Sequence, residues 1–272
     1  MEPLIRIVPA WDGLPLRVRI WDGGDRLMPV LCLPGLVRTA GDFDAVVPLF
    51  AAGRRVVALD YAGRGGSGRS ANIMRYGPEA CARDVLDVCA ALHLHHAAVV
   101  GTSFGGLLAM GLAVARPALV RAVILNDVGP EIGGAGADFV RDFVGLDPAL
   151  ESLEACVTFL KQRLPPLSLS SDDDWRAMAA LTYEPGPDER FHPMWDVAIA
   201  RLLRRPTPNL WPLFGALAHG AVSTLLLPET VAKMRAQRPD MTVVTVPGVG
   251  HAPILTEEII RDTLIEFISC AD

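Results

Sequence analysis

The sequence predicts an α/β fold in which a mostly parallel sheet of about eight strands carries helices on both faces. Three observations predict this fold. Short continuous apolar runs alternate with helical spacings through the first 130 residues, a pattern typical of a parallel sheet that is buried on both faces. Residues 131–211 are rich in proline and hold helical fragments without a convincing strand, and the alternation of strand and helix returns from residue 212. We therefore expect a core formed by residues 1–130 and 212–272, with residues 131–211 inserted as a helical lid.

The predicted strands show two different patterns. Residues 5–9 and 16–21 alternate apolar and polar side chains on either side of Trp11-Asp12-Gly13, which predicts an antiparallel hairpin. The other expected strands are apolar runs, at 29–33, 55–60, 97–101, 122–126, 222–227 and 241–246. Helical spacing and favourable first residues predict the helices that connect them, at 78–92, 104–115, 228–238 and 256–268.

Composition excludes several classes of protein. Apolar residues form 51% of the 272 residues and charged residues 21%, which excludes general disorder. The net charge of −6, without a basic stripe, argues against nucleic acid as a partner. No charged residue occurs from 97 to 115, but four glycines interrupt this stretch, so we expect a buried strand, turn and helix there rather than a membrane span.

Cysteines and the first residues indicate the compartment. The five cysteines are widely spaced and form no C-x-x-C pair, so neither a disulfide framework nor a zinc site is expected. The first residues hold neither a positive segment nor a long apolar run, so no signal peptide is expected. These patterns predict a cytoplasmic protein with reduced thiols, no metal and no membrane association.

The strongest catalytic signal is the sequence Gly101-Thr102-Ser103-Phe104-Gly105, which matches G-x-S-x-G. A predicted strand ends at this motif and a predicted helix starts from it. A strand that turns directly into a helix holds its serine in a strained conformation, and side chains two positions to either side would collide. The turn projects the Ser103 hydroxyl above the sheet and leaves helix N–H groups for a developing oxyanion. We therefore interpret Ser103 as a nucleophile rather than an incidental serine in a glycine-rich loop.

A nucleophilic serine needs a base, and the chain has six histidines. His251 lies in a glycine-bounded loop between the last predicted strand and the last predicted helix. Such a loop reaches the same edge of a parallel sheet as Ser103, so position favours His251 as the base over an ordinary surface residue. His93, His95 and His96 precede a strand without an acidic or cysteine companion, and we interpret them as a polar connection.

These patterns together resemble serine hydrolases of the α/β-hydrolase fold, over nearly the whole chain. The turn Leu33-Pro34-Gly35-Leu36 occupies the place of the family's His-Gly oxyanion turn, with proline in place of histidine. The segment 60–67 resembles the family's D-x-R-G-x-G-x-S. Segments 38–43 and 126–130 look like parts of its small esterase and carbon–carbon-bond hydrolase branches. The resemblance implies that the backbone N–H groups of Leu36 and Phe104 donate to the oxyanion, that the substrate is a small molecule and that no cofactor is used.

The chain departs from the family at the third member of the catalytic triad. The family's acid follows the next-to-last strand, in a loop resembling R-G-x-x-S-D. In one alignment this loop is absent and the strand runs directly into Pro228; in the other, residues 220–224 are the loop and Thr224 replaces the aspartate. The first alignment is preferred because it keeps an apolar strand. Asp127, after the strand that follows the nucleophile, and Glu229, at the end of the shortened strand, are the candidates to replace the acid, and Asp127 alternatively caps a turn.

Other side chains have two expected roles. Several lid aromatics are candidates to line an apolar substrate pocket or, equally, to form the lid's own small core. They are Phe139, Phe143, Trp175, Tyr183, Trp195 and Trp211, of which Phe139, Phe143, Trp175 and Trp195 are the named candidates for the pocket. Arg38 and Asp42 follow the oxyanion turn, where they either contact a substrate carboxylate or pair with each other. Asp60 is expected to be structural and to close the glycine-rich turn.

The combined expectation is a serine hydrolase, monomeric or homodimeric, that cleaves a small, largely apolar ester, lactone or similar carbonyl substrate by Ser-His catalysis. The alternative is a hydrolase-derived ligand-binding or signalling protein whose turnover is impaired because the usual acid loop is missing.

Overall fold

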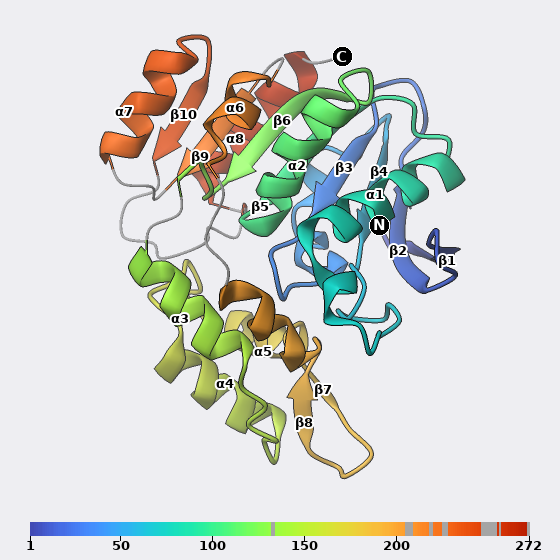
Figure 1. Cartoon of the computed structure of the whole chain (residues 1–272), viewed down its shortest axis with the longest axis vertical. Helices are drawn as coiled ribbons and strands as arrows, with labels where there is room; N and C mark the ends of the chain where they lie inside the picture. Colours follow the sequence, from blue (N-terminus) through green and yellow to red (C-terminus); the bar gives the residue numbers. More distant parts are fainter. Residues whose placement is uncertain are drawn as a thin grey trace.

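The centre of the structure is one eight-stranded sheet with the strand order β1-β2-β4-β3-β5-β6-β9-β10 (Figure 1). The structure is a computed structural model that describes residues 1–131, 134–204, 209–217, 220–224, 228–245, 255 and 257–270. The sheet strands are β1 (Leu4–Pro9), β2 (Pro15–Asp22), β3 (Val30–Leu33), β4 (Arg55–Leu59), β5 (Ala97–Thr102), β6 (Val120–Asn126), β9 (Gly220–Thr224) and β10 (Thr242–Thr245). The α/β fold predicted from the sequence is confirmed.

The sheet begins with the predicted antiparallel hairpin and continues as a parallel sheet. β1 pairs with β2 from Leu4 opposite Ile20 to Pro9 opposite Pro15, and β2 pairs antiparallel with β4. The later neighbours, from β4 through β3, β5, β6 and β9 to β10, run parallel. Parallel strands have their carboxyl ends at one edge, so the segments that follow β3, β5, β6, β9 and β10 all start from that edge.

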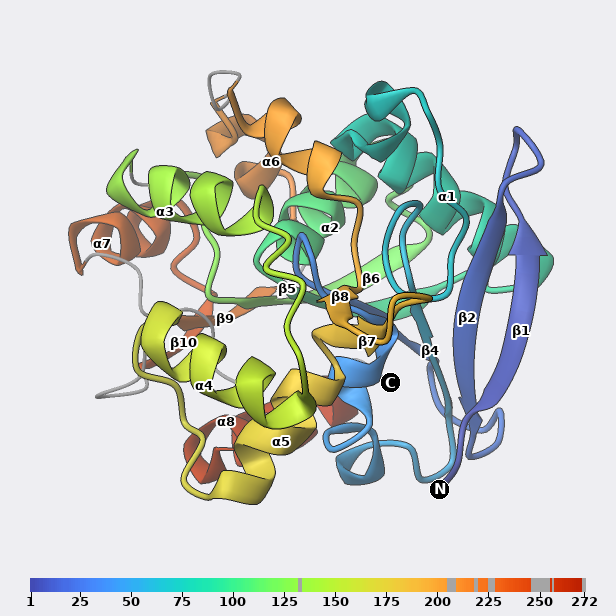
Figure 2. The same ribbon diagram turned by 90° about the horizontal axis from the view of Figure 1, so that it is seen from below.

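Helices cover both faces of the sheet (Figure 2). They are α1 (Pro78–Ala91), α2 (Phe104–Ala115), α6 (Trp211–Gly215), α7 (Pro228–Gln237) and α8 (Glu258–Cys270), with the short 3-10 helices η1 (Ala40–Phe43), η2 (Val47–Leu49) and η3 (Ile73–Tyr76). One core gathers side chains of α1, α2, α6 and α7, and the other gathers those of η1, η2 and α8. Successive strand residues alternate between the two cores, as Val99 and Val100 do. Burial of both faces explains why the strands read as continuous apolar runs.

Residues 134–204 form a group of elements between β6 and α6, which we call the insertion. It consists of α3 (Gly134–Val144), α4 (Leu153–Arg163), α5 (Asp172–Ala180), β7 (Tyr183–Pro185), β8 (Phe191–Pro193) and the 3-10 helix η4 (Val197–Arg204). Its helices and hairpin lie beyond one end of the sheet (Figure 1). The insertion has a small apolar core of its own, which includes Cys156, Leu160, Ala179 and Tyr183.

The β7–β8 hairpin corrects the sequence analysis, which expects no strand in this region. Tyr183 pairs with Pro193 and Pro185 with Phe191, in antiparallel register. Each strand has only three residues and ends in a proline, which has no N–H for a hydrogen-bond ladder. A strand this short shows no period-two alternation, so its pattern does not stand out in the sequence.

All five cysteines are free thiols, four of them buried and Cys270 exposed. Burial raises the pKa of Cys81 and Cys156 to about 11 and that of Cys89 to about 12. Within the described residues, every helix is too short or too polar to traverse a lipid bilayer.

Candidate active site

The sharp turn predicted at Ser103 is present. β5 ends at Thr102 and α2 begins at Phe104, so Ser103 alone joins the strand to the helix. Its backbone adopts φ 51° and ψ −114°, in the half of conformational space that residues other than glycine rarely occupy. Such a conformation persists only where the surrounding structure imposes it.

Two glycines allow this turn. A Cβ atom on Gly101 would lie 2.6 Å from the backbone of Gly105, and a Cβ atom on Gly105 would collide with the backbone carbonyl of Leu33. The predicted need for glycine two residues before and two residues after Ser103 is therefore confirmed. The second collision also shows that the start of α2 lies directly against the end of β3.

Hydrogen bonds hold Ser103 beside the end of β6. Its backbone N–H donates to the carbonyl of Asn126 at 2.9 Å, and the Asn126 amide donates to Thr102 Oγ1 at 3.2 Å. The Ser103 carbonyl accepts the N–H groups of Gly106 at 2.9 Å and Leu107 at 3.2 Å, which form the first turn of α2. Ser103 is thus fixed at the carboxyl edge of the sheet, between β5 and β6.

The two expected oxyanion donors lie on segments that pack against each other. Leu36 lies in the turn after β3, and Phe104 is the first residue of α2. The Phe104 ring meets that of Tyr61 edge to face at 5.6 Å, and the Tyr61 hydroxyl donates to the carbonyl of Pro34 at 3.2 Å. Among the described residues, no acceptor pairs with the N–H of Leu36 or of Phe104. Both N–H groups are therefore available to another acceptor.

Sequence reasoning missed Arg64, which lies behind this turn. Its side chain is buried, Nε donates to the carbonyl of Leu36 at 2.9 Å, and Nη1 donates to the carbonyl of Ala62 at 2.7 Å. Arg64 lies in the segment 60–67, at a position that the family pattern leaves open. The sequence signal is an arginine within a turn of small residues, and that signal does not reveal a contact with residue 36.

His251, the expected base, lies outside the described residues, together with the rest of 246–254. The strand before this stretch, β10, ends at Thr245 and runs parallel to β9 and β6. Its carboxyl end therefore lies at the edge of the sheet that holds Ser103. The pairing of Ser103 with His251 stays a prediction.

The two candidate acids differ in burial. Asp127 directly follows β6, has a positive φ of 52° and is 5% exposed. Its neighbour Asn126 supplies the carbonyl that holds Ser103. Glu229 is exposed in the first turn of α7. Burial and proximity to the serine turn favour Asp127.

The pairing of β9 decides between the two alignments of the acid loop. Residues 220–224 pair with β6 through Ser223 opposite Asn126, and with β10 through Thr224 opposite Thr245. They form a sheet strand, so the alignment that makes them the acid loop is wrong. α7 begins at Pro228, so three positions, 225–227, separate the described ends of β9 and α7, and these three lie outside the described residues. The preferred alignment, without the usual acid loop, agrees with this spacing.

Arg38 and Asp42 pair with each other, the second of their two expected roles. Arg38 Nε and Nη2 donate to the two carboxylate oxygens of Asp42 at 2.8 and 2.6 Å. The remaining nitrogen, Nη1, donates to Thr182 Oγ1 at 2.6 Å, which joins the segment after the turn that follows β3 to the insertion. The Arg38 guanidinium and the Asp42 carboxylate thus form a two-point ion pair with each other.

Asp60 closes the glycine-rich turn, as expected. Its carboxylate accepts the N–H of Ala40 at 2.7 Å and the N–H of Gly66 at 2.9 Å. Burial raises the pKa of the Asp60 carboxyl, and the two N–H donors act in the opposite direction. These contacts give Asp60 a structural role.

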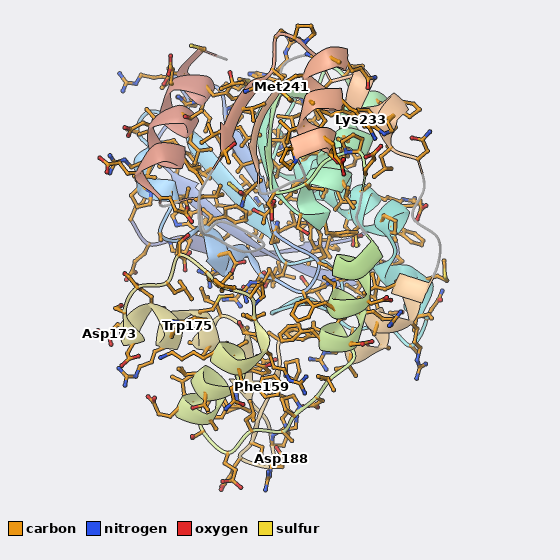
Figure 3. The ribbon with its side chains drawn as sticks, turned by 90° about the vertical axis from the view of Figure 1, so that its left-hand side faces the viewer. Phe159, Asp173, Trp175, Asp188, Lys233 and Met241 are labelled. Atoms are coloured by element: carbon orange, nitrogen blue, oxygen red, sulfur yellow. The ribbon has the colours of Figure 1, made fainter. Side chains whose placement is uncertain are left out.

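The four aromatic residues expected in a pocket lie at different depths. Trp195 is 2% exposed and belongs to the main core. Phe143 lies 5.8 Å from Trp195 between ring centres, and Phe139, which is 42% exposed, stacks on Phe143 at 6.3 Å. Trp175 and Phe159 pack against the small core of the insertion (Figure 3). That Phe139, Phe143, Trp175 and Trp195 line a substrate pocket stays a prediction.

The sequence is similar to those of known hydrolases. The family model described as "Alpha/beta hydrolase family" matches residues 30–262. A curated relative from Cupriavidus necator, 3-hydroxybutyrate-oligomer hydrolase, is 32% identical over 262 residues, which cover 89% of each chain. Another, 2-(acetamidomethylene)succinate hydrolase from Mesorhizobium japonicum, is 29% identical and covers 72% of this chain and 71% of its own.

Solved structures of hydrolases match the fold of this chain over nearly its whole length. An alpha/beta hydrolase from Novosphingobium aromaticivorans matches with a TM-score of 0.91 at 33% identity, over 98% of both chains. The structure of E-2-(acetamidomethylene)succinate hydrolase matches with a TM-score of 0.80 at 25% identity, over 98% of this chain and all of the other.

Proposed function

The chain belongs to the alpha/beta hydrolase family and is a hydrolase, and we propose that it cleaves a small, largely apolar ester, lactone or similar carbonyl substrate with Ser103 as its nucleophile. The observation that carries this proposal is the strained turn at Ser103, enclosed by Gly101 and Gly105 at the carboxyl edge of the sheet. The relative named as a hydrolase of 3-hydroxybutyrate oligomers supports an ester substrate, because units of a hydroxy acid join through ester bonds.

In the proposed mechanism His251 takes the proton of the Ser103 hydroxyl, and the alkoxide attacks the substrate carbonyl. The N–H groups of Leu36 and Phe104 donate to the oxyanion of the tetrahedral intermediate. His251 then protonates the leaving group, and an acyl-enzyme forms on Ser103. Water deprotonated by His251 hydrolyses that ester and releases the acid. Each step keeps the developing negative charge beside the turn after β3.

The test of this mechanism is loss of turnover when either reacting side chain is removed. We expect Ser103→Ala and His251→Ala to lower kcat for p-nitrophenyl acetate by at least about 10³-fold, because the two groups act as a unit. His95→Ala, at an exposed histidine outside the motif, is the matched control and should keep full activity. A fluorophosphonate probe should label the wild type and not Ser103→Ala. Turnover that is unchanged in both site variants would refute the proposal.

We further propose Asp127 as the acid that orients His251. An acid in this role fixes the imidazole tautomer and stabilises the imidazolium, and its removal costs about 10⁴ in kcat in a well-studied protease. We expect Asp127→Asn to lower kcat by about 10²-fold or more, and Glu229→Gln to change it less than about twofold, because Glu229 is exposed. Steady-state kinetics on the same ester measure both. The reverse order of effects would assign the acid to Glu229.

A second candidate function is a ligand-binding or signalling protein with impaired turnover. The observation that favours it is that the sequence has only three positions, 225–227, between the described ends of β9 and α7, which are too few for the usual acid loop. A panel of esters, lactones, vinylogous diketones and 3-hydroxybutyrate oligomers separates the two functions. Saturable binding without cleavage of any member of the panel would favour this second candidate.

A further inference from the structure

Arg64 is a buried cation that touches both segments of the proposed oxyanion site. It is 1% exposed, and its Nε donates to the carbonyl of Leu36 at 2.9 Å. The central carbon of the guanidinium lies 5.8 Å from the ring centres of Phe104, Tyr61 and Tyr76. Leu36 and Phe104 are the two residues whose N–H groups we assign to the oxyanion. One side chain thus contacts both.

The surroundings of Arg64 are unusual for a buried charge. Buried cations normally pair with a carboxylate, because removal of a charge from water is expensive. Within the described part of the chain, Arg64 has no carboxylate partner, and its buried Nη2 finds no nitrogen or oxygen acceptor. Carbonyl oxygens and aromatic faces solvate it instead. A guanidinium kept here without a counter-ion points to a use beyond packing.

The hydrogen bond from Arg64 to the turn after β3 indicates what this use is. The Leu36 carbonyl that accepts Nε belongs to the same residue as the N–H assigned to the oxyanion, so this bond restricts rotation of residue 36. On the other side of Gly35, the Tyr61 hydroxyl donates to the Pro34 carbonyl at 3.2 Å. The turn is therefore held by a hydrogen bond on each side of Gly35.

The backbone of Arg64 is in turn held by the insertion. Gly65 donates its N–H to the carbonyl of Met194 at 2.6 Å, and Asp196 donates its N–H to the carbonyl of Gly63 at 2.8 Å. Arg64 lies opposite Trp195 in this short antiparallel bridge. The insertion therefore sets the position from which Arg64 reaches Leu36.

We propose that Arg64 is a positioning residue that orients the Leu36 N–H toward the oxyanion, and that residues 194–196 of the insertion fix its place. This inference rests on the proposed serine hydrolase function. Its chemical consequence is specific, because the oxyanion exists in the tetrahedral intermediate and not in the bound substrate. Loss of Arg64 should therefore weaken binding of the transition state more than binding of the substrate.

The test compares Arg64→Lys and Arg64→Gln with the wild type. Lysine keeps the charge, but its single ammonium cannot reproduce the planar fork that reaches Leu36 and Ala62 together. We expect both variants to lower kcat for p-nitrophenyl acetate by about 10- to 100-fold, with KM changed less than about threefold, because a displaced oxyanion donor acts on the transition state. The affinity for an aryl trifluoromethyl ketone, which forms a tetrahedral adduct on serine, should fall by a similar factor.

Arg75→Lys is the matched control. Arg75 is another buried arginine, but it pairs with Asp84 at 2.7 Å and with Asp12 at 2.7 Å rather than with the oxyanion turn. This variant should lower the melting temperature and leave kcat of the folded protein unchanged. An Arg64→Lys protein that is folded, with kcat and ketone affinity equal to the wild type, overturns the inference. Recovery of full activity by lysine but not by glutamine also overturns it, since charge alone would then suffice.

Two further variants, Tyr61→Phe and Ser103→Ala, complete the test. If the Arg64 variants do not fold, Tyr61→Phe removes the other bond to the turn and keeps the ring; we expect a severalfold lower kcat at constant KM, and an unchanged kcat would count against the inference. Ser103→Ala separates a failure of the proposed function from a failure of the inference about Arg64. Full turnover in Ser103→Ala defeats the proposed function, whereas an essential Ser103 with unaffected Arg64 variants defeats only this inference.

Discussion

Two residues of the candidate site share a backbone conformation that is uncommon outside glycine. Ser103 and Asp127 both have positive φ values, 51° and 52°, and they follow strands β5 and β6, which pair side by side. Each such residue costs on the order of 1–3 kcal/mol, which the rest of the fold must offset. A positive φ also occurs at His93, Ala149, Glu189 and Leu255, so it does not assign a role by itself. Ser103 and Asp127 differ from those residues in that they directly follow two neighbouring strands of the sheet.

A glycine substitution tests the close packing behind Ser103. We expect Gly105→Ala to lower the free energy of unfolding by about 1–3 kcal/mol and to abolish turnover, because its Cβ would collide with the backbone carbonyl of Leu33. Gly111→Ala on the same helix is the control. A Cβ there meets nothing within 4 Å, so the variant should gain about 0.5–1 kcal/mol of stability and keep its activity. Urea unfolding and ester hydrolysis measure both, and a stable, active Gly105→Ala would contradict the packing.

At this scale the sequence predicts residues whose role lies in a local pattern. Ser103 and its flanking glycines were identified because the turn needs them at fixed spacing, and Asp60 because it belongs to a glycine-rich turn. The role of Arg64 was not predicted because its partner, the Leu36 carbonyl, is 28 residues away. Every residue type has such a carbonyl, so the identity of residue 36 gives no signal. The choice between the two roles of Arg38 and Asp42 also required coordinates, since the same pair of residues suits a substrate or a mutual bond.

Among the elements, the β7–β8 hairpin carries a pH-sensitive contact. His192 Nδ1 lies 2.9 Å from Asp147 and its Nε2 lies 2.9 Å from Asp188, near the tip of the hairpin (Figure 3). Hydrogen bonds to Asp188 and then Asp147 raise the pKa of His192 above its ordinary 6.5, and the bond to His192 lowers the pKa of Asp188 below 3.8. Between pH 3.8 and pH 6.5, therefore, His192 is protonated and Asp188 is ionised, and the contact joins opposite charges.

The sign of the pH effect follows from these directions. The contribution of His192 to stability is fully present below pH 6.5 and is lost as the pH rises through the raised pKa of the folded state. We expect the protection factors of the amide hydrogens in residues 183–193, which are exchange rates corrected for the intrinsic base-catalysed increase with pH, to fall over that rise. The fall should be small because the contact lies at the surface. His192→Gln should remove this dependence, and the matched His95→Gln should keep it. An NMR titration of His192 at or below 6.5 would contradict the expectation.

Element type was predictable where the pattern was long or repeated. The hairpin at the start of the chain and the parallel strands follow from alternation and from apolar runs that two covered faces require. β7 and β8 were missed because three residues carry no period, and both depend on pairing with each other rather than on propensity. A strand was expected at 222–227; the structure describes Gly220–Thr224 as β9, paired with β6 and β10, and residues 225–227 lie outside the described part of the chain.

Across the whole molecule, parallel topology explains why distant parts of the chain meet. The turn after β3, Ser103 after β5 and Asp127 after β6 lie at one edge because their strands are neighbours in the sheet order. The sequence indicates a parallel sheet and a fold family, from which this shared edge follows. It does not predict the hydrogen bonds that tie the insertion to the segment 63–65, since these join backbone groups across more than a hundred residues.

The distribution of thiols has a practical consequence. Burial and a raised pKa keep Cys81, Cys89 and Cys156 unreactive toward maleimides at neutral pH, whereas Cys270 is exposed at the end of α8. A fluorophore can be attached there without any cysteine being engineered. The native chain thus offers a single anchoring point for immobilisation or fluorescence polarisation during substrate screening.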